Sequence, residues 1–407
     1  MPNEDVRRVK GDISRAGGSR RRPGGATLVL LLASLAGCGS EPPASGPPPA
    51  PPTLADVGER LFHDPSLSAS GVLACATCHT AHQAHADPES TFLPIGGATL
   101  REQGLRSSPS LRYLDALGPF RILGPGRAAG GLFWDGRADT RAAQARGPLF
   151  SEIEMANADA PDFVLRLRVV PYFQDLVAAA SLGAGAGDED LLDAALRALD
   201  AYQVVDVEFH PFNSRYDAFL EGRGTLTAQE EHGLQLFNDP AAGNCAACHP
   251  SSPGASGEKP LFTDFSYAAL GVPRNHASVN ADPAFFDLGL CGPRRTDLAD
   301  RSDLCGMFRV PSLRNVARTG PYFHNAPMAS LTDAVSFHVT RDTHPELWYP
   351  TVNGVVQKFD DLPAAYHGNV TTIAPFGGAA GSAPPLRPQD VADIVAFLGT
   401  LTDGILP

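Results

Sequence analysis

The 407-residue sequence lacks three features that would each have pointed to a broad class of protein. Its apolar stretch at 26–36 is too short to span a bilayer as a helix, which excludes an integral membrane protein built on it. No alternating apolar pattern of strand length occurs, so a sheet-based fold is not expected. Basic residues are outnumbered, and the formal net charge of −13 argues against nucleic-acid binding. The acidic balance fits either solubility or a basic protein partner.

The first 37 residues are typical of a bacterial export signal. They carry seven Lys/Arg and three Asp/Glu, all ahead of the apolar stretch. Leu35-Ala-Gly-Cys38 resembles a bacterial lipobox, so we expect cleavage before Cys38 and lipidation of its thiol; the alternative is an ordinary signal cut nearby. Residues 38–54 would then form a proline-rich tether. The prediction is an exported, periplasmic or outer-membrane-anchored lipoprotein of a Gram-negative bacterium, which meets the membrane through its lipid alone.

Two short strings carry the strongest chemical signal: Cys75-Ala-Thr-Cys78-His79 and Cys245-Ala-Ala-Cys248-His249. A C-x-x-C-H run is the covalent attachment signature of c-type haem, whose iron the histidine binds. The alternatives are a redox C-x-x-C pair and a zinc site made of the four cysteines. Neither requires a histidine directly after both pairs. We therefore expect two covalently bound haem c groups.

A second repeat precedes each haem motif. Residues 58–65 and 233–240 both read G-x-x-L-F-x-D-P, and the two haem motifs lie 170 residues apart. This spacing is too long for a solenoid repeat and is typical of two related domains. We expect an N-terminal haem domain at 55–207 and a C-terminal haem domain at 208–407.

Helical periodicity predicts a mostly α fold: two cytochrome-c-like domains, each wrapping one haem, with long loops. The 41 glycines and 37 prolines fit chains that wrap a cofactor. Apolar spacing predicts six helices, at 53–62, 140–145, 188–205, 227–237, 331–339 and 388–401.

Two cysteines remain once Cys38 and the haem motifs are set aside. Cys291 and Cys305 fit a disulfide that closes a small loop in an oxidising compartment. The alternative is a pair of free thiols. Only the distance between the sulfur atoms decides between them.

Two longer strings identify a family. Residues 133–148 read F-W-D-G-R-A-D-T-R-A-A-Q-A-R-G-P, and residues 310–324 read V-P-S-L-R-N-V-A-R-T-G-P-Y-F-H. With both haem motifs, they resemble the bacterial di-haem cytochrome c peroxidase and MauG family over residues 55–402. The resemblance implies that the N-terminal haem, held by His79, reacts with hydrogen peroxide.

The resemblance also assigns roles between the two haem motifs. Glu154 matches the distal acid/base that helps to break the O–O bond, and Gln144 matches its distal neighbour. Trp134 matches the tryptophan between the haems, where it passes electrons from one iron to the other. Trp134 can also pack in the core as an aromatic residue, and this role is compatible with electron transfer.

The second ligand of the C-terminal haem departs from the family. The family places it fourteen residues after the histidine of P-Y-F-H, as Met in the peroxidases and Tyr in MauG. Counting from His324 gives His338. We expect a low-spin haem bound by His249 and His338, with a lower potential than a methionine ligand would give. The alternative is that His344 or water binds instead.

Two further positions depart from the family. The peroxidases cap the resting N-terminal iron with a histidine where this chain has Ile95, so we expect that iron to be open, although His85 is close enough in sequence to swing in. The family also holds a calcium ion between its domains through groups that match Thr319 and Pro321. Ser107 stands where the family has asparagine; carbonyl oxygens still suit calcium, which is therefore a possible second cofactor.

Strings at 288–293, 305–311, 341–350 and 360–366 resemble the MbnH branch, MauG-like proteins that oxidise a tryptophan of a copper-binding periplasmic partner. The first hypothesis is therefore peroxide-driven oxidation of a partner protein by long-range electron transfer. The second is a peroxidase that detoxifies hydrogen peroxide with electrons from a small cytochrome or cupredoxin. A plain electron carrier is disfavoured, since it needs no acid/base beside an open iron. Trp348 and Tyr349 are candidate relay residues, but packing is the favoured interpretation for both.

Overall fold

A computed structural model describes residues 50–87, 93–278 and 281–404. The expected export signal, Cys38 and the tether up to residue 49 lie outside these ranges. The described part beyond residue 50 contains ten α-helices and eight short strands. None of the helices in these ranges is both long and apolar enough to cross a bilayer.

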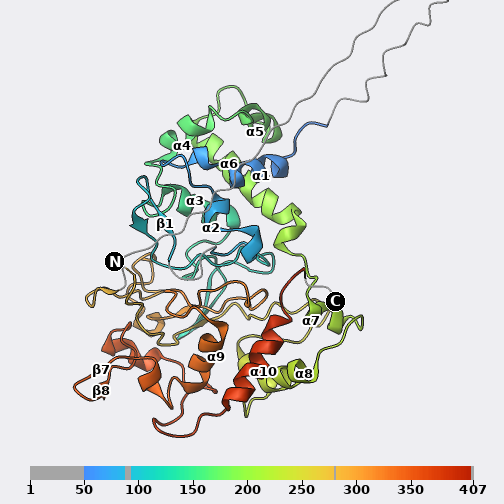
Figure 1. Cartoon of the computed structure of the whole chain (residues 1–407). Coiled ribbons are helices and arrows are strands. Elements are labelled where there is room, and N and C mark those ends of the chain that lie inside the picture. Colours follow the sequence, from blue (N-terminus) through green and yellow to red (C-terminus); the bar gives the residue numbers. More distant parts are fainter. Residues whose placement is uncertain (1–49, 88–92, 279–280, 405–407) are drawn as a thin grey trace, which may run out of the picture. The chain divides into compact units, whose positions relative to one another are not determined.

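The helices, drawn in Figure 1, are α1 Leu54–His63, α2 Cys75–Cys78, α3 Arg141–Phe150, α4 Ala160–Leu167, α5 Phe173–Ala179, α6 Asp188–Val205, α7 Arg215–Leu220, α8 Ala228–Asn238, α9 Leu331–Thr340 and α10 Pro388–Gly399. The strands form four antiparallel pairs. They are β1 Ile95–Gly96 with β2 Glu102–Gln103, β3 Arg121–Gly124 with β4 Arg127–Ala129, β5 Tyr267–Ala268 with β6 Phe308–Arg309, and β7 Thr351–Val352 with β8 Val355–Val356. The fold is thus mostly α, with loops between the helices, as predicted.

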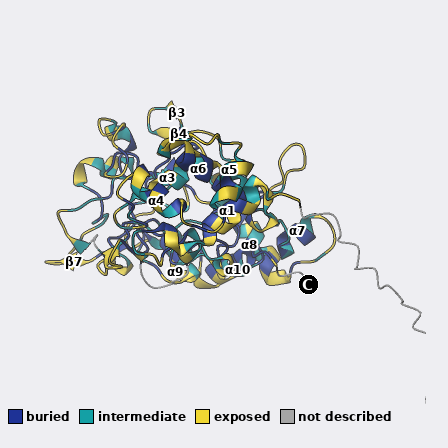
Figure 2. Cartoon of the chain, turned by 90° about the horizontal axis from the view of Figure 1, so that it is seen from above, coloured by how far each residue is buried: buried dark blue, intermediate teal, exposed yellow. Residues whose placement is uncertain are grey.

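In the first half, α1 crosses α6 at a glycine. A Cβ atom on Gly58 would lie 1.9 Å from the carbonyl oxygen of Ala198, so no larger residue fits without moving the helices apart. Leu61 and Phe62 follow on the buried face of α1, at 2% exposure each. With leucines of α4, α5 and α6 they form one apolar core, and Figure 2 shows the buried stripe and exposed face of such helices.

The second half repeats this crossing between α8 and α10. A Cβ atom on Gly233 would lie 2.0 Å from the carbonyl oxygen of Asp393. Phe237 is 1% exposed and packs against Phe397 of α10 with ring centroids 5.3 Å apart. The G-x-x-L-F repeat therefore marks the same helix-crossing geometry twice. The aspartate that follows it also has the same role twice, because its side chain accepts from a backbone N–H two residues on, in Asp64 and Asp239.

All six predicted helices occur, with ends displaced by up to five residues. The largest difference is at α3, which continues to Phe150 through Pro148 and Gly147, where the sequence analysis ended it at residue 145. Four helices were not predicted, α2, α4, α5 and α7, because each has eight residues or fewer and so few turns give a weak periodic signal. The strands, of two to four residues, were likewise too short to show an alternating pattern.

Polar contacts join the two halves. The guanidinium of Arg106 bonds Asp135 and Asp287, each at 2.7 Å, and all three side chains are almost fully buried. Asp403, near the end of the described chain, accepts from Tyr113 at 2.7 Å and from Arg112 at 3.2 Å. Buried contacts of this kind fix how the two halves meet.

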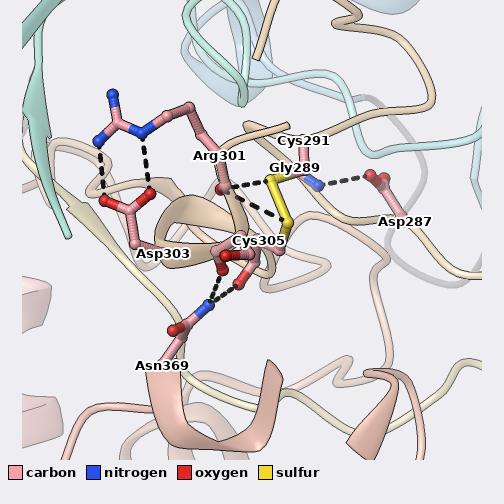
Figure 3. The surroundings of a disulfide bond; sticks show 8 residues. Asp287, Gly289, Cys291, Arg301, Asp303, Cys305 and Asn369 are labelled. Atoms are coloured by element: carbon pink, nitrogen blue, oxygen red, sulfur yellow. Dashed lines mark hydrogen bonds and ion pairs between the residues drawn. A yellow bond between two sulfur atoms is a disulfide. The ribbon is translucent and has the colours of Figure 1, made fainter. Parts of the chain in front are cut away.

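A disulfide joins Cys291 and Cys305 and closes a loop whose ends lie 5.0 Å apart between Cα atoms (Figure 3). Asn369 donates to the carbonyl oxygens of Ser302 and Cys305 and so ties this loop to a later segment. Leu290 and Leu304, both fully buried, pack beside the disulfide in a core of their own. The cross-link therefore stabilises a loop in which the described residues form no α-helix, only the short 3-10 turn Ser302–Leu304.

Candidate functional site

The first haem motif begins in the single helical turn α2. The hydroxyl of Thr77 accepts from the Ala74 N–H at 2.9 Å, which caps this turn, and the His79 N–H closes it on the Cys75 carbonyl. The Nδ1 atom of His79 lies 3.0 Å from the carbonyl oxygen of His85. Burial lowers the pKa of His79 and keeps the ring neutral. With Nδ1 as the donor to a carbonyl, Nε2 is the nitrogen left to bind an iron.

The second haem motif has the same local design. A short 3-10 turn at Cys245–Ala247 follows Asn244, whose backbone is left-handed. The Nδ1 atom of His249 lies 2.7 Å from the carbonyl oxygen of Phe262, and burial lowers the pKa of this ring too. His249 is thus oriented like His79.

A cavity of about 730 Å³ adjoins the second motif. Cys245, Cys248 and His249 line it, and so does His338 of α9. The Nδ1 atom of His338 lies 2.8 Å from the Ala334 carbonyl, and its ring stacks on Phe323 with centroids 5.7 Å apart.

The chemistry of this cavity suits a haem iron bound from two sides. Burial, with a smaller effect of the nearby His249, lowers the pKa of His338 to about 4, so both rings are neutral at pH 7 and offer Nε2. The volume is of the size that cofactor sites have. His344, the alternative ligand, lies instead with Nδ1 3.1 Å from Glu346 on a half-exposed turn. These contacts favour His338 over His344.

The first motif has a different group nearby. Glu154 is exposed, and its charge acts on the Cys78 thiol and on Arg137, so it lies close to both. Strand β1 packs against its backbone: Gly97 donates to the Glu154 carbonyl at 2.8 Å. Ile95 therefore lies in the strand beside Glu154, and this part of the chain presents a carboxylate rather than an imidazole.

Gln144 lies half-buried on α3, four residues after the N-cap Thr140. Within the described ranges, neither Gln144 nor Glu154 forms a side-chain hydrogen bond, with the other or with any third residue. No hydrogen bond in the described ranges therefore fixes either side chain, and none joins Gln144 to Glu154.

His85 is held away from the role of a capping ligand. Its carbonyl orients His79, and its ring stacks on Phe209 with centroids 4.2 Å apart and is 2% exposed. Burial lowers the pKa of His85 to about 4, with Arg112 adding to the effect. Moving this ring would break its stack on Phe209 and take it out of its buried site, so the structure disfavours the swing that its sequence position allows.

Trp134 lines the same cavity as His249 and His338. Its indole N–H donates to the Ser107 carbonyl at 2.9 Å, and its own carbonyl accepts from Arg309 N–H at 2.9 Å. One contact comes from the first half of the chain and the other from the second. Trp134 is therefore held between the halves, where an electron relay would be placed.

The residues considered for calcium also meet here. Thr319 and Pro321 line the cavity. The hydroxyl of Ser107, at the position of the family's asparagine, donates to the Phe323 carbonyl at 2.9 Å instead of pointing to open space. Calcium therefore stays a prediction that rests on carbonyl oxygens.

Trp348 and Tyr349 are packed into the second half. The Trp348 indole donates to Thr340 at 2.9 Å and meets Phe337 edge-on at 5.6 Å, next to His338. Tyr349 is 3% exposed and donates to the Gly271 carbonyl. Packing accounts for both, as favoured from the sequence.

Three further residues line the cavity and were not predicted as site residues: Arg309, Phe323 and Asp361. Each lies within a string that carries a family resemblance, Phe323 in 310–324, Arg309 in 305–311 and Asp361 in 360–366, so these strings were a usable signal. The strings could not show that the fold brings the three residues to one cavity.

Comparisons with known proteins agree with this arrangement. A family model described as di-haem cytochrome c peroxidase matches residues 52–225. The methylamine utilization protein MauG of Paracoccus denitrificans (strain Pd 1222) is 37% identical over 322 residues, 76% of this chain and 81% of that protein. The diheme peroxidase BthA from Burkholderia thailandensis E264 is 39% identical with a TM-score of 0.78, over 87% of this chain and 86% of that one.

A MauG-like protein associated with microbial copper homeostasis has a TM-score of 0.61 and 24% identity, over 90% of this chain and 95% of that one, and shares the fold. The alignments with MauG and BthA, both above 30% identity, cover 76% or more of this chain and of each relative. The chain therefore belongs to the di-haem cytochrome c peroxidase and MauG family, and it is a peroxidase-type enzyme with two covalently attached haem c groups.

Proposed function

We propose that the enzyme uses hydrogen peroxide at its N-terminal haem and oxidises a partner protein by long-range electron transfer. One observation carries the proposal. His249 and His338 line one cavity as two neutral imidazoles, whereas the first motif has His79 on one side and the carboxylate of Glu154 nearby. One iron would be closed on both sides, and the other would be open to peroxide.

The residues near the first motif would handle protons. When bound, the N-terminal haem supplies the iron at which peroxide is reduced. Glu154 takes a proton from one peroxide oxygen and delivers it to the other, and Gln144 orients the substrate. Each peroxide requires two electrons and two protons to give two waters, and the partner supplies the electrons through the second haem and Trp134.

The partner we propose is a copper-binding protein with an oxidisable tryptophan. This part rests on the four strings at 288–293, 305–311, 341–350 and 360–366, which resemble the MbnH branch. The location goes with it: a periplasmic chain that is held to the membrane through a lipid on Cys38.

A second candidate is a peroxidase that removes hydrogen peroxide with electrons from a small cytochrome or cupredoxin. The 39% identity to a protein described as a diheme peroxidase favours it. The predicted ligand pair His249 and His338 weighs against it, because a haem without methionine has a lower potential and accepts electrons less readily from a high-potential donor.

Peroxide added to the fully ferric protein separates the two candidates. Protein oxidation predicts an immediate spectral change without any reductant and a long-lived oxidised state of both haems. A scavenger of the reductively activated kind predicts no change until one haem is reduced. Electron paramagnetic resonance of the resting protein is the companion measurement, and a high-spin signal with no low-spin species would contradict the assignment of His338.

A further inference from the structure

One buried arginine in the cavity has no acidic partner. Five arginines are less than 8% exposed, and four of them pair with a carboxylate: Arg274 with Asp361, Arg295 with Asp297, Arg314 with Asp217 and Arg341 with Asp342. Arg309 is the exception. Among the residues that the structure describes, its guanidinium has a single hydrogen bond, from Nε to the Phe133 carbonyl at 3.1 Å.

An unpaired buried cation is costly for a fold. A charge that leaves water without a counter-charge loses its solvation, and nothing in the protein replaces it. Burial lowers the pKa of Arg309, and the charge of Tyr267 acts against this effect. Arginine does not lose its proton in proteins, so the buried guanidinium needs an anion as its partner.

The position of Arg309 shows from where that anion would come. Strand β6 ends at Arg309 and pairs with β5, and the residue's N–H donates to the Trp134 carbonyl at 2.9 Å. Arg309 lines the cavity together with His249 and His338. The cation therefore lies between the tryptophan and the space that the second haem would fill.

We propose that Arg309 binds a propionate carboxylate of the second haem. The inference rests on the proposed function, since it needs a haem held by His249. The two Nη groups of a guanidinium match the two oxygens of a carboxylate. The pair would neutralise both charges beside Trp134, keep the propionate ionised and set the haem potential, which makes Arg309 a positioning residue and not a catalytic one.

The test uses holoprotein carrying Arg309→Gln or Arg309→Lys, with Arg121→Gln, an exposed arginine on β3, as the control. Haem content per chain is measured first. The midpoint potential of each haem is then followed against pH by spectroscopic redox titration. We expect Arg309→Gln to lower the potential of the second haem, because a cation near an iron favours its reduced form. We also expect the pH dependence of that potential to move to higher pH, because the propionate loses its partner.

Arg309→Lys keeps the charge but loses the two-pronged guanidinium, so it should shift the potential and its pH dependence in the same direction as Arg309→Gln but less, while Arg121→Gln should match the wild type. Two haems in Arg309→Gln with unchanged potentials and an unchanged pH profile would overturn this inference and leave the proposed function standing. One haem or none in the wild-type protein would instead overturn the proposed function. If Arg309→Gln does not load haem, Arg309→Lys decides: a changed pH profile supports the pairing, and a wild-type profile refutes it.

Discussion

The two haem motifs are built alike on the side of the attached histidine. In the first, His79 Nδ1 lies 3.0 Å from the carbonyl oxygen of His85, and in the second, His249 Nδ1 lies 2.7 Å from that of Phe262. Each follows a helix whose glycine allows a close crossing with another helix. The repeated sequence therefore encodes attachment and ring orientation, which both haems need.

The opposite sides are not alike. The second motif faces His338, an imidazole on α9 that is oriented by the Ala334 carbonyl and stacked on Phe323. The first has Glu154, on a loop braced by β1. The comparison shows that two motifs with the same local framework differ in a few side chains outside the repeat, and each prediction below changes one side of it.

The largest effect should come from Glu154. If it is the acid/base of the first site, Glu154→Gln should slow the reaction of the ferric protein with peroxide by roughly 10²–10⁴-fold, the range for general acid–base groups. Stopped-flow absorbance measures the rate. Glu152→Gln is the matched control, since Glu152 is also exposed and lies two residues earlier on the same loop. Equal rates for both variants would remove Glu154 from the chemistry.

The two crossing glycines should be equally sensitive if the halves share one framework. Gly58→Ala and Gly233→Ala each place a Cβ atom within 2.0 Å of a backbone oxygen, and overpacking costs roughly 1–3 kcal/mol, occasionally more. Thermal unfolding followed by haem absorbance gives the loss for each. Gly185→Ala, where a Cβ atom meets nothing within 4 Å, is the control. A large loss in one half alone would show that the crossings are not equivalent.

His338 should set the potential of the second haem. His338→Met replaces an imidazole by a thioether, and axial ligands move haem potentials across about 0.8 V, so a rise on the order of 0.1 V is expected. The first haem should keep its potential. His344→Ala, at the alternative position, should change neither haem. If His344→Ala changed the potential of the second haem and His338→Met did not, His344 and not His338 would be its second ligand.

Much of this could be read from the sequence, and the reason differs from part to part. The haem motifs and the family strings are local, so the covalent cofactors and the enzyme class were predicted and are confirmed by the relatives. Long amphipathic helices such as α6 were also found. Cys291 and Cys305, expected as a pair, form a disulfide.

What escaped prediction depends on contacts distant in sequence. That Arg309 lacks a carboxylate partner is known only from the structure, in which the four other buried arginines each have one. Trp134 bonds one residue 27 positions before it, and its carbonyl meets one from the second half. The positions of Glu154 and His338 relative to a bound haem stay predictions, tested by the variants above.

The smallest effect concerns Asp361, the buried acid of the second site; the first motif has the buried Asp87, whose charge acts on Cys78. It is 6% exposed and lines the cavity of the second motif. Burial raises its pKa to about 7; Arg274 and a hydrogen bond from Asn325 act against the rise, and Asp287 and Asp360 add to it. At pH values between the ordinary pKa of an aspartate and about 7, Asp361 holds a proton in the folded protein that it has released in the unfolded chain. Folding is therefore favoured at the lower pH, and stability falls as pH rises through this window.

Asp361→Asn removes that proton site, so the variant should gain stability relative to the wild type as pH rises. For a pKa of about 7 in the folded state, linkage gives about 1.4 kcal/mol between pH ~6 and pH ~8. Denaturant unfolding of both proteins at the two pH values measures the difference, in which contributions of other carboxylates cancel. Asp300→Asn, an exposed control, should show no such change. A constant difference between Asp361→Asn and wild type would mean that Asp361 is already ionised in the folded protein, held so by Arg274 at 3.2 Å.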